Sequence, residues 1–240
     1  MAGIHSNRGA KRAREARREL GLEVDAPLRC ILSVVEERAG LPVFIARLPA
    51  DVAGACYRAG DGTLLWVNAS QWPARQRFTL AHELGHAWCE HDGRLEVDTL
   101  ATLNGKTTTP AEIEANAFAA EFLVPHAGLA AVIDGEPTLD EVVVISAHYG
   151  VSAIMVVYRL KQLRLASDAR IERLEAEIRD RLHGPAFERL GLEPLADRLA
   201  RIEQLPYLSA ALRGSALGAA LRGGPVVDGR MLGAIDRLLA

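Results

Sequence analysis

Apolar residues recur along the chain at the two spacings that distinguish helices from strands. From Pro27 to Ala39 they recur every three or four positions, which predicts a first helix that ends at Gly40. Three short apolar runs follow, at residues 43–46, 55–57 and 63–67, with turn residues between them. Runs of this length between turns predict strands joined by hairpins, so we expect a small antiparallel sheet.

Helices are predicted for most of the remaining chain. One spans about residues 73–90, and the next runs from Pro110 to Leu123. Two more lie on either side of Gly150 and start at the capping residues Thr138 and Ser152, which gives a helix-turn-helix outline. The pattern therefore predicts an α+β fold in which a small sheet packs on helices.

Beyond residue 166 the pattern indicates a helical C-terminal extension. Apolar residues recur at helical spacing in 171–182 and 195–202, the segment 214–224 is rich in glycine, and a short helix is predicted at 232–239. Three roles fit such amphipathic helices: covering the core, forming a homodimer and docking a partner.

Composition limits where the protein works. With 240 residues, 49% of them hydrophobic, and a formal net charge of −3, the chain is typical of a soluble globular protein. No apolar run approaches the ~20 residues of a membrane span, and three scattered cysteines argue against a disulfide framework, so we expect a cytoplasmic protein without a membrane partner. Six basic residues against two acids make the first 19 residues a basic arm, which we interpret as a solvated, partly frayed tail; direct nucleic-acid binding is disfavoured.

The pentapeptide from His82 to His86, His-Glu-Leu-Gly-His, carries the most specific chemistry. Positions four apart on a helix lie about 40° apart around the axis and ~6 Å along it, so both imidazoles can reach one zinc ion. Glu83 points in a neighbouring direction, where it can act as general base on a water held by the metal. Gly85 costs a helix about 1 kcal/mol relative to alanine, which suggests that another backbone or a substrate passes close by. We therefore predict one zinc ion per chain and a peptide hydrolase.

A catalytic zinc needs a third protein ligand, which we expect on the helix that follows. Asp92 stands where the extended HExxHxxGxxH arrangement has its third histidine, so a glutamate is the natural substitute. Glu112 lies on a stripe of small residues that lets its helix approach the zinc-binding helix, whereas the stripe of Glu114 is bulkier and ends in a charge suited to solvent. Glu112 is therefore favoured as the ligand and Glu114 is the alternative, although Thr109 and Glu112 also fit a capping box.

Other residues are candidates for supporting roles. Asn116, one turn beyond Glu112, could accept the second ring proton of a ligating histidine and fix its tautomer. Donors for the oxyanion formed during hydrolysis are sought among His148, Tyr149, Tyr158 and Arg159. The second helix of the helix-turn-helix outline opens with the apolar run 153–157, whereas a DNA-recognition helix needs polar side chains at that end. We interpret this helix as core packing under the active site.

Together these motifs resemble the ImmA/IrrE family of zinc metallopeptidases. The matching features, within roughly residues 25–165, are Asn68 at the end of a strand, the run from Arg75 to His86, Glu112, Asn116, Phe118-Ala119-Ala120, Leu123-Val124-Pro125, Val151-Ser152 and Tyr158-Arg159-Leu160. The resemblance implies a zincin-like fold and supports Glu112 as the third ligand.

The resemblance also implies a function. Members of the family inactivate helix-turn-helix transcriptional repressors, often by cutting them, and so switch on stress-response or mobile-element genes. Some relatives carry their own helix-turn-helix domain, but the segment before Pro27 is too short for one, so the repressor is expected to be a separate chain. The alternative is a non-catalytic anti-repressor that sequesters its partner and uses zinc only structurally.

These features divide the chain into four predicted parts. They are a basic N-terminal arm (1–24), a zinc metallopeptidase core (25–136), a helix-turn-helix-like subdomain packed on the core (137–166) and the helical C-terminal extension (167–240). The extension lies outside the resemblance.

Overall fold

The α+β class predicted from the sequence is confirmed by a computed structural model, which describes residues 2–49, 51–59, 62–91, 95–103, 109–192 and 207–208. Its elements, in chain order, are α1 (Ala2–Glu19), α2 (Ile31–Ser33), the π-helical turn η1 (Val34–Arg38), β1 (Val43–Ala46), β2 (Val52–Ala59), β3 (Gly62–Asn68), α3 (Pro73–Trp88), β4 (Leu95–Thr99), α4 (Leu100–Leu103), α5 (Pro110–Leu123), α6 (His126–Ala130), α7 (Leu139–Tyr149), α8 (Ala153–Leu163), α9 (Asp168–Arg179), α10 (His183–Arg189) and β5 (Tyr207–Leu208).

The described strands form one sheet in the order β4-β2-β3-β1-β5. Strands β2 and β3 form an antiparallel hairpin, but β1 and β3 run parallel, with Val43 opposite Leu65. The predicted sheet is therefore mixed, and the expectation that it is wholly antiparallel is wrong. The reason is that the hairpin returns β3 to the central position between β2 and β1, where it follows the direction of β1.

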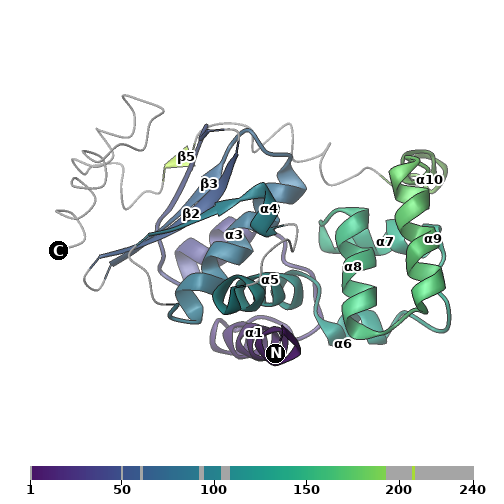
Figure 1. Ribbon diagram of the computed structural model, residues 1–240, viewed down its shortest axis with the longest axis horizontal. Coiled ribbons are helices and arrows are strands. Elements are labelled where there is room, and N and C mark those ends of the chain that lie inside the picture. Colours follow the sequence, from purple (N-terminus) through teal and green to yellow (C-terminus); the bar gives the residue numbers. More distant parts are fainter. Residues whose placement is uncertain are drawn as a thin grey trace.

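Helices cover the sheet in successive layers (Figure 1). Helix α3 packs against β2 and β3, α5 packs on α3, and α1 packs on the far side of α5. The helices α7 to α10 form a second group beside these layers. The layered arrangement buries α3 between the sheet and α5, so the His-Glu-Leu-Gly-His segment has no exposed residue.

Gly85 marks the place where α3 and α5 meet. A Cβ atom added there would lie 3.2 Å from the Cα of Ala115 and 3.2 Å from the Cβ of Phe118, which is tight for any side chain. Ala115 and Ala119 are completely buried in this contact. The expectation that another backbone passes close to Gly85 is confirmed, and the small residues of α5 are the reason that it can.

Residues 2–19 form a packed helix, so the prediction of a solvated, partly frayed tail is wrong. In α1 a stripe of small residues, Gly9, Ala13 and Ala16, faces α5. Ala13 and Ala16 are completely buried. Small residues at positions four and three apart let two helices approach closely, and this spacing is the signal for a buried helix that the basic charge obscured.

Arg17 is the basic residue that departs furthest from a solvated arm, since only 2% of it is exposed. Its guanidinium donates hydrogen bonds to the backbone carbonyls of Phe122 at 2.6 Å and Ala26 at 2.6 Å, and twice to that of Glu23. Burial lowers the pKa of Arg17, but this fan of carbonyl acceptors compensates for the lost hydration. Arg17 thereby ties α1 to the end of α5.

We expect Gly9→Ala to destabilise the protein and Gly3→Ala to leave it unchanged or slightly more stable. An added Cβ at Gly9 would overlap the backbone carbonyl of Glu114, whereas nothing lies within 4 Å of a Cβ at Gly3 in the same helix. Overpacking costs about 1–3 kcal/mol, and because the overlap here is with backbone atoms we expect a cost in the upper part of that range, above the gain of about 1 kcal/mol from replacing a helical glycine. Urea unfolding followed by circular dichroism measures both; equal stability of the two variants would contradict the packing of α1 on α5.

The helix-turn-helix outline is realised by α7 and α8, with Gly150 at φ 66° ending the first helix. Thr138 and Glu141 form the capping box of α7, and Ser152 caps α8. Val156, Val157 and Leu160 are completely buried, so α8 contributes to the core, as predicted. Among the described helices none by itself has the length and apolar character of a membrane span; α7 and α8 pass that test only as a pair bent by 105°.

The C-terminal extension is described as far as Leu192, with two further residues in β5. Helix α9 buries Ile171 and Leu174, in agreement with the predicted spacing. Strand β5 pairs with β1. The elements predicted at 195–202, 214–224 and 232–239 lie outside the described residues. The four-part division of the chain stays a prediction.

Candidate metal centre

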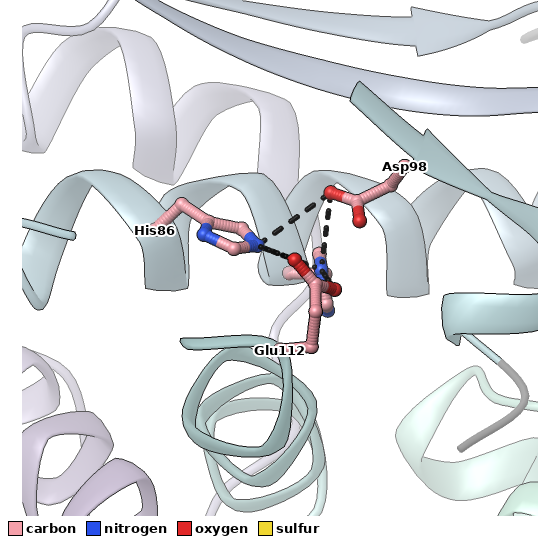
Figure 2. A group of neighbouring side chains, drawn as sticks. His86, Asp98 and Glu112 are labelled. Atoms are coloured by element: carbon pink, nitrogen blue, oxygen red, sulfur yellow. Dashed lines mark hydrogen bonds and ion pairs between the residues drawn. The ribbon is translucent and has the colours of Figure 1, made fainter. Parts of the chain in front are cut away.

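Four side chains from three elements converge between α3, α5 and β4 (Figure 2). His82 and His86 lie one turn apart on α3, and their Nε2 atoms are 3.0 Å from each other. Glu112 reaches both from α5, with Oε2 3.3 Å from His82 Nε2 and Oε1 3.4 Å from His86 Nε2. Both histidines are completely buried, and 8% of Glu112 is exposed. The structure thus brings together the three side chains that the sequence suggested as zinc ligands.

The fourth member, Asp98 of β4, was missed by the sequence predictions. Its Oδ2 lies 3.2 Å from His82 Nε2 and 3.5 Å from His86 Nε2. The sequence predictions assigned no strand between the helices at about 73–90 and 110–123, although Leu95, Val97 and Thr99 alternate with Glu96 and Asp98 at strand spacing. In the folded chain that alternation leaves Val97 49% exposed and turns Asp98 inward, where 1% of it is exposed.

The cluster has the size and chemistry of a site for a divalent metal ion. The four donor atoms lie within 4.8 Å of one another, and each histidine Nε2 is 3.0–3.5 Å from the other donors that contact it. A tetrahedral site with bonds of ~2.0–2.1 Å has donors about 3.3 Å apart. Oδ2 of Asp98 and Oε2 of Glu112 are buried and have no hydrogen-bond donor. Buried carboxylates need a compensating charge, so a dication fits this set.

Electrostatics within the cluster point the same way. Burial by itself lowers the pKa of His82, but the neighbouring carboxylates of Asp98 and Glu112 outweigh it and raise the pKa to about 9. Burial by itself raises the pKa of Glu112, and the two histidines outweigh it and lower the pKa below its usual range. Without a metal, a proton on His82 thus balances part of the charge of the carboxylates, and a dication that binds must displace that proton.

Glu83 lies beside this cluster. It is completely buried and belongs to the same helix, α3. Its carboxylate faces Gly54 of β2, where an added Cβ would lie 2.5 Å from Glu83 Oε1 and 2.7 Å from the carbonyl oxygen of Trp66. Gly54 in turn pairs with Asp98 across the β2–β4 ladder. Only glycine at position 54 leaves room for the Glu83 carboxylate. Glu83 therefore lies next to the group of four side chains and is not a member of it.

Glu112 and Glu114 point to different neighbours. Thr109 caps α5 through the backbone N–H of Glu112, at 3.4 Å, while the Glu112 side chain turns to the histidines. Glu114 faces α1 instead: its Oε1 accepts from His5 Nδ1 at 2.9 Å, and its Oε2 lies 3.5 Å from Arg8 Nε. The backbone N–H of Glu112 is therefore capped by the Thr109 hydroxyl, and the Glu112 side chain is still able to contact the two histidines.

A chain of hydrogen bonds connects the cluster with α1, and no sequence argument predicted it. His86 Nδ1 lies 3.0 Å from His91 Nδ1, and His91 Nε2 lies 3.2 Å from Glu114 Oε2. If His86 presents Nε2 to a metal, its Nδ1 carries the proton and donates to His91, which then donates from Nε2 to the carboxylate. Burial and the neighbouring His86 lower the pKa of His91, which favours the neutral ring that this order requires.

We expect His91→Ala to weaken metal binding without abolishing it. The substitution removes the group that fixes the orientation and tautomer of His86, and loss of such a partner typically costs 10–100-fold in metal affinity. Competition between the protein and a coloured zinc chelator measures the effect. His148→Ala is the matched control, because His148 is exposed on α7. Equal zinc affinity of the two variants would show that the hydrogen bonds from His86 through His91 to Glu114 have no influence on zinc binding.

The side-chain amide of Asn116 makes a hydrogen bond to the backbone of α4. Its Nδ2 donates to the backbone carbonyl of Thr102 in α4 at 2.9 Å, and no hydrogen bond joins it to His82 or His86. Oδ1 of Asn116 and Nδ1 of His82 are both buried without a hydrogen-bond partner. Asn116 thus fastens α4, which directly follows Asp98, to α5; a contact with the ring proton of a ligating histidine stays a prediction.

The four residues considered as oxyanion donors lie on α7 and α8, outside the cluster. The Tyr149 hydroxyl donates to the carbonyl of Asp25 at 2.8 Å, and Arg159 forms an ion pair with Glu121. His148 and Tyr158 are exposed. The structure does not bring these four residues to His82, His86 or Glu112.

Glu121, the partner of Arg159, is itself buried, with 1% exposed. The expectation that the stripe of Glu114 on α5 ends in a solvated charge is therefore wrong, because Arg159 and Arg14 neutralise Glu121.

The fold and the cluster define a class: an α+β protein with an HExxH helix beneath a mixed sheet and a carboxylate from the next long helix beside the two histidines. Comparison with known families agrees with this class. The model of the IrrE N-terminal-like domain, a peptidase M78 domain, matches residues 36–161, which is just over half of the chain. The chain therefore belongs to this family, as the resemblance implied. No curated protein matches the chain.

Proposed function

We propose that this protein is a zinc-dependent metalloendopeptidase. The observation that carries the proposal is the buried group of His82, His86 and Glu112 with the carboxylate of Glu83 beside it. Membership of a peptidase family supports hydrolysis, and two imidazoles with a carboxylate are one of the ligand sets of catalytic zinc. His82, His86 and Glu112 would hold the ion, one per chain.

Zinc held by these residues would polarise the substrate carbonyl and make a water molecule more acidic. Glu83 would accept the proton of the attacking water, and it can then deliver a proton to the leaving amine. Its burial between α3 and β2 fixes the carboxylate in one place, so that the proton acceptor is positioned before the substrate arrives. His91 and Glu114 would maintain the tautomer of His86 throughout.

For the substrate we propose a helix-turn-helix transcriptional repressor supplied as a separate chain in the cytoplasm. Its cleavage or inactivation would derepress stress-response or mobile-element genes. Support comes from the family resemblance and from the match to the IrrE N-terminal-like domain. A homodimer formed by the C-terminal helices remains part of the proposal, since α9 and α10 lie at the edge of the helical group (Figure 1).

The direct experiment uses the purified protein and a repressor encoded beside it. The two are incubated with zinc, and in parallel with a chelator, and the products are separated by mass spectrometry. Discrete repressor fragments that appear only with zinc are the expected result. An intact repressor in both reactions, with zinc bound to the protein, would reject the peptidase and leave binding as the activity.

One observation favours the second candidate, a non-catalytic anti-repressor with a structural metal. Asp98 gives the cluster four protein donors, and a closed set of four is typical of structural zinc. On this alternative the repressor forms a stable complex with the protein and is not cut. Size-exclusion chromatography of the two proteins, run alongside the mass spectrometry, distinguishes a stable complex from a transient substrate.

A further inference from the structure

Asp98 is a buried acid on an edge strand, and the packing of the sheet does not explain its burial. It lies on β4, at the edge of the sheet, opposite Gly54 where the β2–β4 register shifts. Figure 2 shows its carboxylate directed at the side chains of His86 and Glu112, from the strand above the two helices. Only 1% of Asp98 is exposed. Burial of an acid at a sheet edge is costly unless it meets a positive charge.

The two oxygens of Asp98 have different surroundings. Oδ1 accepts a hydrogen bond from the Thr102 hydroxyl at 3.2 Å, and the backbone carbonyl of Thr102 is held by Asn116. Oδ2 has no hydrogen-bond donor and lies 3.2 and 3.5 Å from the Nε2 atoms of His82 and His86. The side chain is thus anchored through one oxygen while the other is directed at the centre of the cluster.

Charge is consistent with the same arrangement. A dication with two neutral imidazoles and the Glu112 carboxylate as ligands keeps a net charge of about +1, and a second coordinating carboxylate makes the ligand set neutral. The distances from Asp98 Oδ2 to the two histidines match those from Glu112, so Asp98 is placed as a ligand and not as a more remote partner.

We propose that Asp98 is the fourth metal ligand in the resting protein and has to leave for a substrate or an inhibitor to reach the metal. This inference rests on the proposed zinc site. Two features make Asp98 the exchangeable ligand: it comes from an edge strand, while the other three come from packed helices, and Glu83 stays beside the site, where a purely structural metal has no use for a base. When it leaves, its Oδ1 retains the Thr102 hydroxyl as a partner.

The test compares the full-length wild type with Asp98→Ala, Asp98→Asn and the exposed control Asp134→Asn. Zinc affinity is measured by chelator competition, and the visible spectrum is recorded with cobalt in place of zinc. We expect both Asp98 variants to bind zinc at least about tenfold more weakly than the wild type and the control, and to shift the cobalt bands. Wild-type affinity and an unchanged spectrum in Asp98→Ala would overturn the assignment.

Acetohydroxamate, a small chelating inhibitor, tests the exchange. It should bind to cobalt-loaded Asp98→Ala more tightly than to the loaded wild type, because it no longer competes with the carboxylate. Equal affinities would refute the displacement even if Asp98 is a ligand. A wild type that binds neither zinc nor cobalt would instead reject the proposed metal centre itself. Circular dichroism of the metal-free variants identifies a folding defect, and Asp98→Asn, which keeps the side-chain volume, provides the test if Asp98→Ala does not fold.

Discussion

Glu83→Gln is expected to leave zinc binding intact and to lower the rate of peptide cleavage by about 10²–10⁴-fold, the usual contribution of a general base. Glutamine has nearly the shape of glutamate, so it fits the space beside Gly54, but its amide cannot accept the proton of the attacking water. The rate of repressor fragmentation, measured at saturating zinc, gives the effect on activity. Metal analysis of the same sample gives the zinc content.

Glu172→Gln is the matched control, because Glu172 is exposed on α9 and the substitution changes the same charge. It should cut the repressor at the wild-type rate. If Glu83→Gln retains full activity with one zinc per chain, Glu83 is not the base. If it loses zinc as well as activity, Glu83 supports the site in another way, and the proposed division of roles between the ligands and the base is wrong.

The metal site could be predicted from the sequence only where its geometry is local. His82, Glu83 and His86 lie within five consecutive residues of one helix, so helical periodicity alone relates their side chains. Glu112 required an argument about how two helices pack, and the small residues of α5 supplied it. Asp98 could not be reached in this way, because its position depends on the pairing of an edge strand with β2, and the alternation in five residues does not show which face of that strand is buried.

The N-terminal helix shows why composition can mislead. Six basic residues suggested a solvated arm, yet Arg17 is buried among carbonyl oxygens and Arg8 and Arg14 meet the buried acids Glu114 and Glu121. These acids lie on α5, and their need for partners is invisible until α5 is placed next to α1. The charge of the arm therefore complements one helix of the same chain, and a partner such as nucleic acid is not required to explain it.

Glu112→Gln and Glu114→Gln are expected to differ in their effect on zinc, although the two residues are two positions apart. Glu112 contacts both histidines, and its replacement removes a charged ligand, so zinc affinity should fall by more than about 100-fold and cleavage with it. Glu114 acts only through His91 and His86, so its replacement should cost no more than about 10–100-fold. Chelator competition at one pH measures both affinities, and thermal unfolding of the metal-free proteins separates ligand loss from the weakened contact between α5 and α1. If Glu114→Gln loses more zinc affinity than Glu112→Gln, then Glu114 is the metal ligand and Glu112 acts only in the capping of α5.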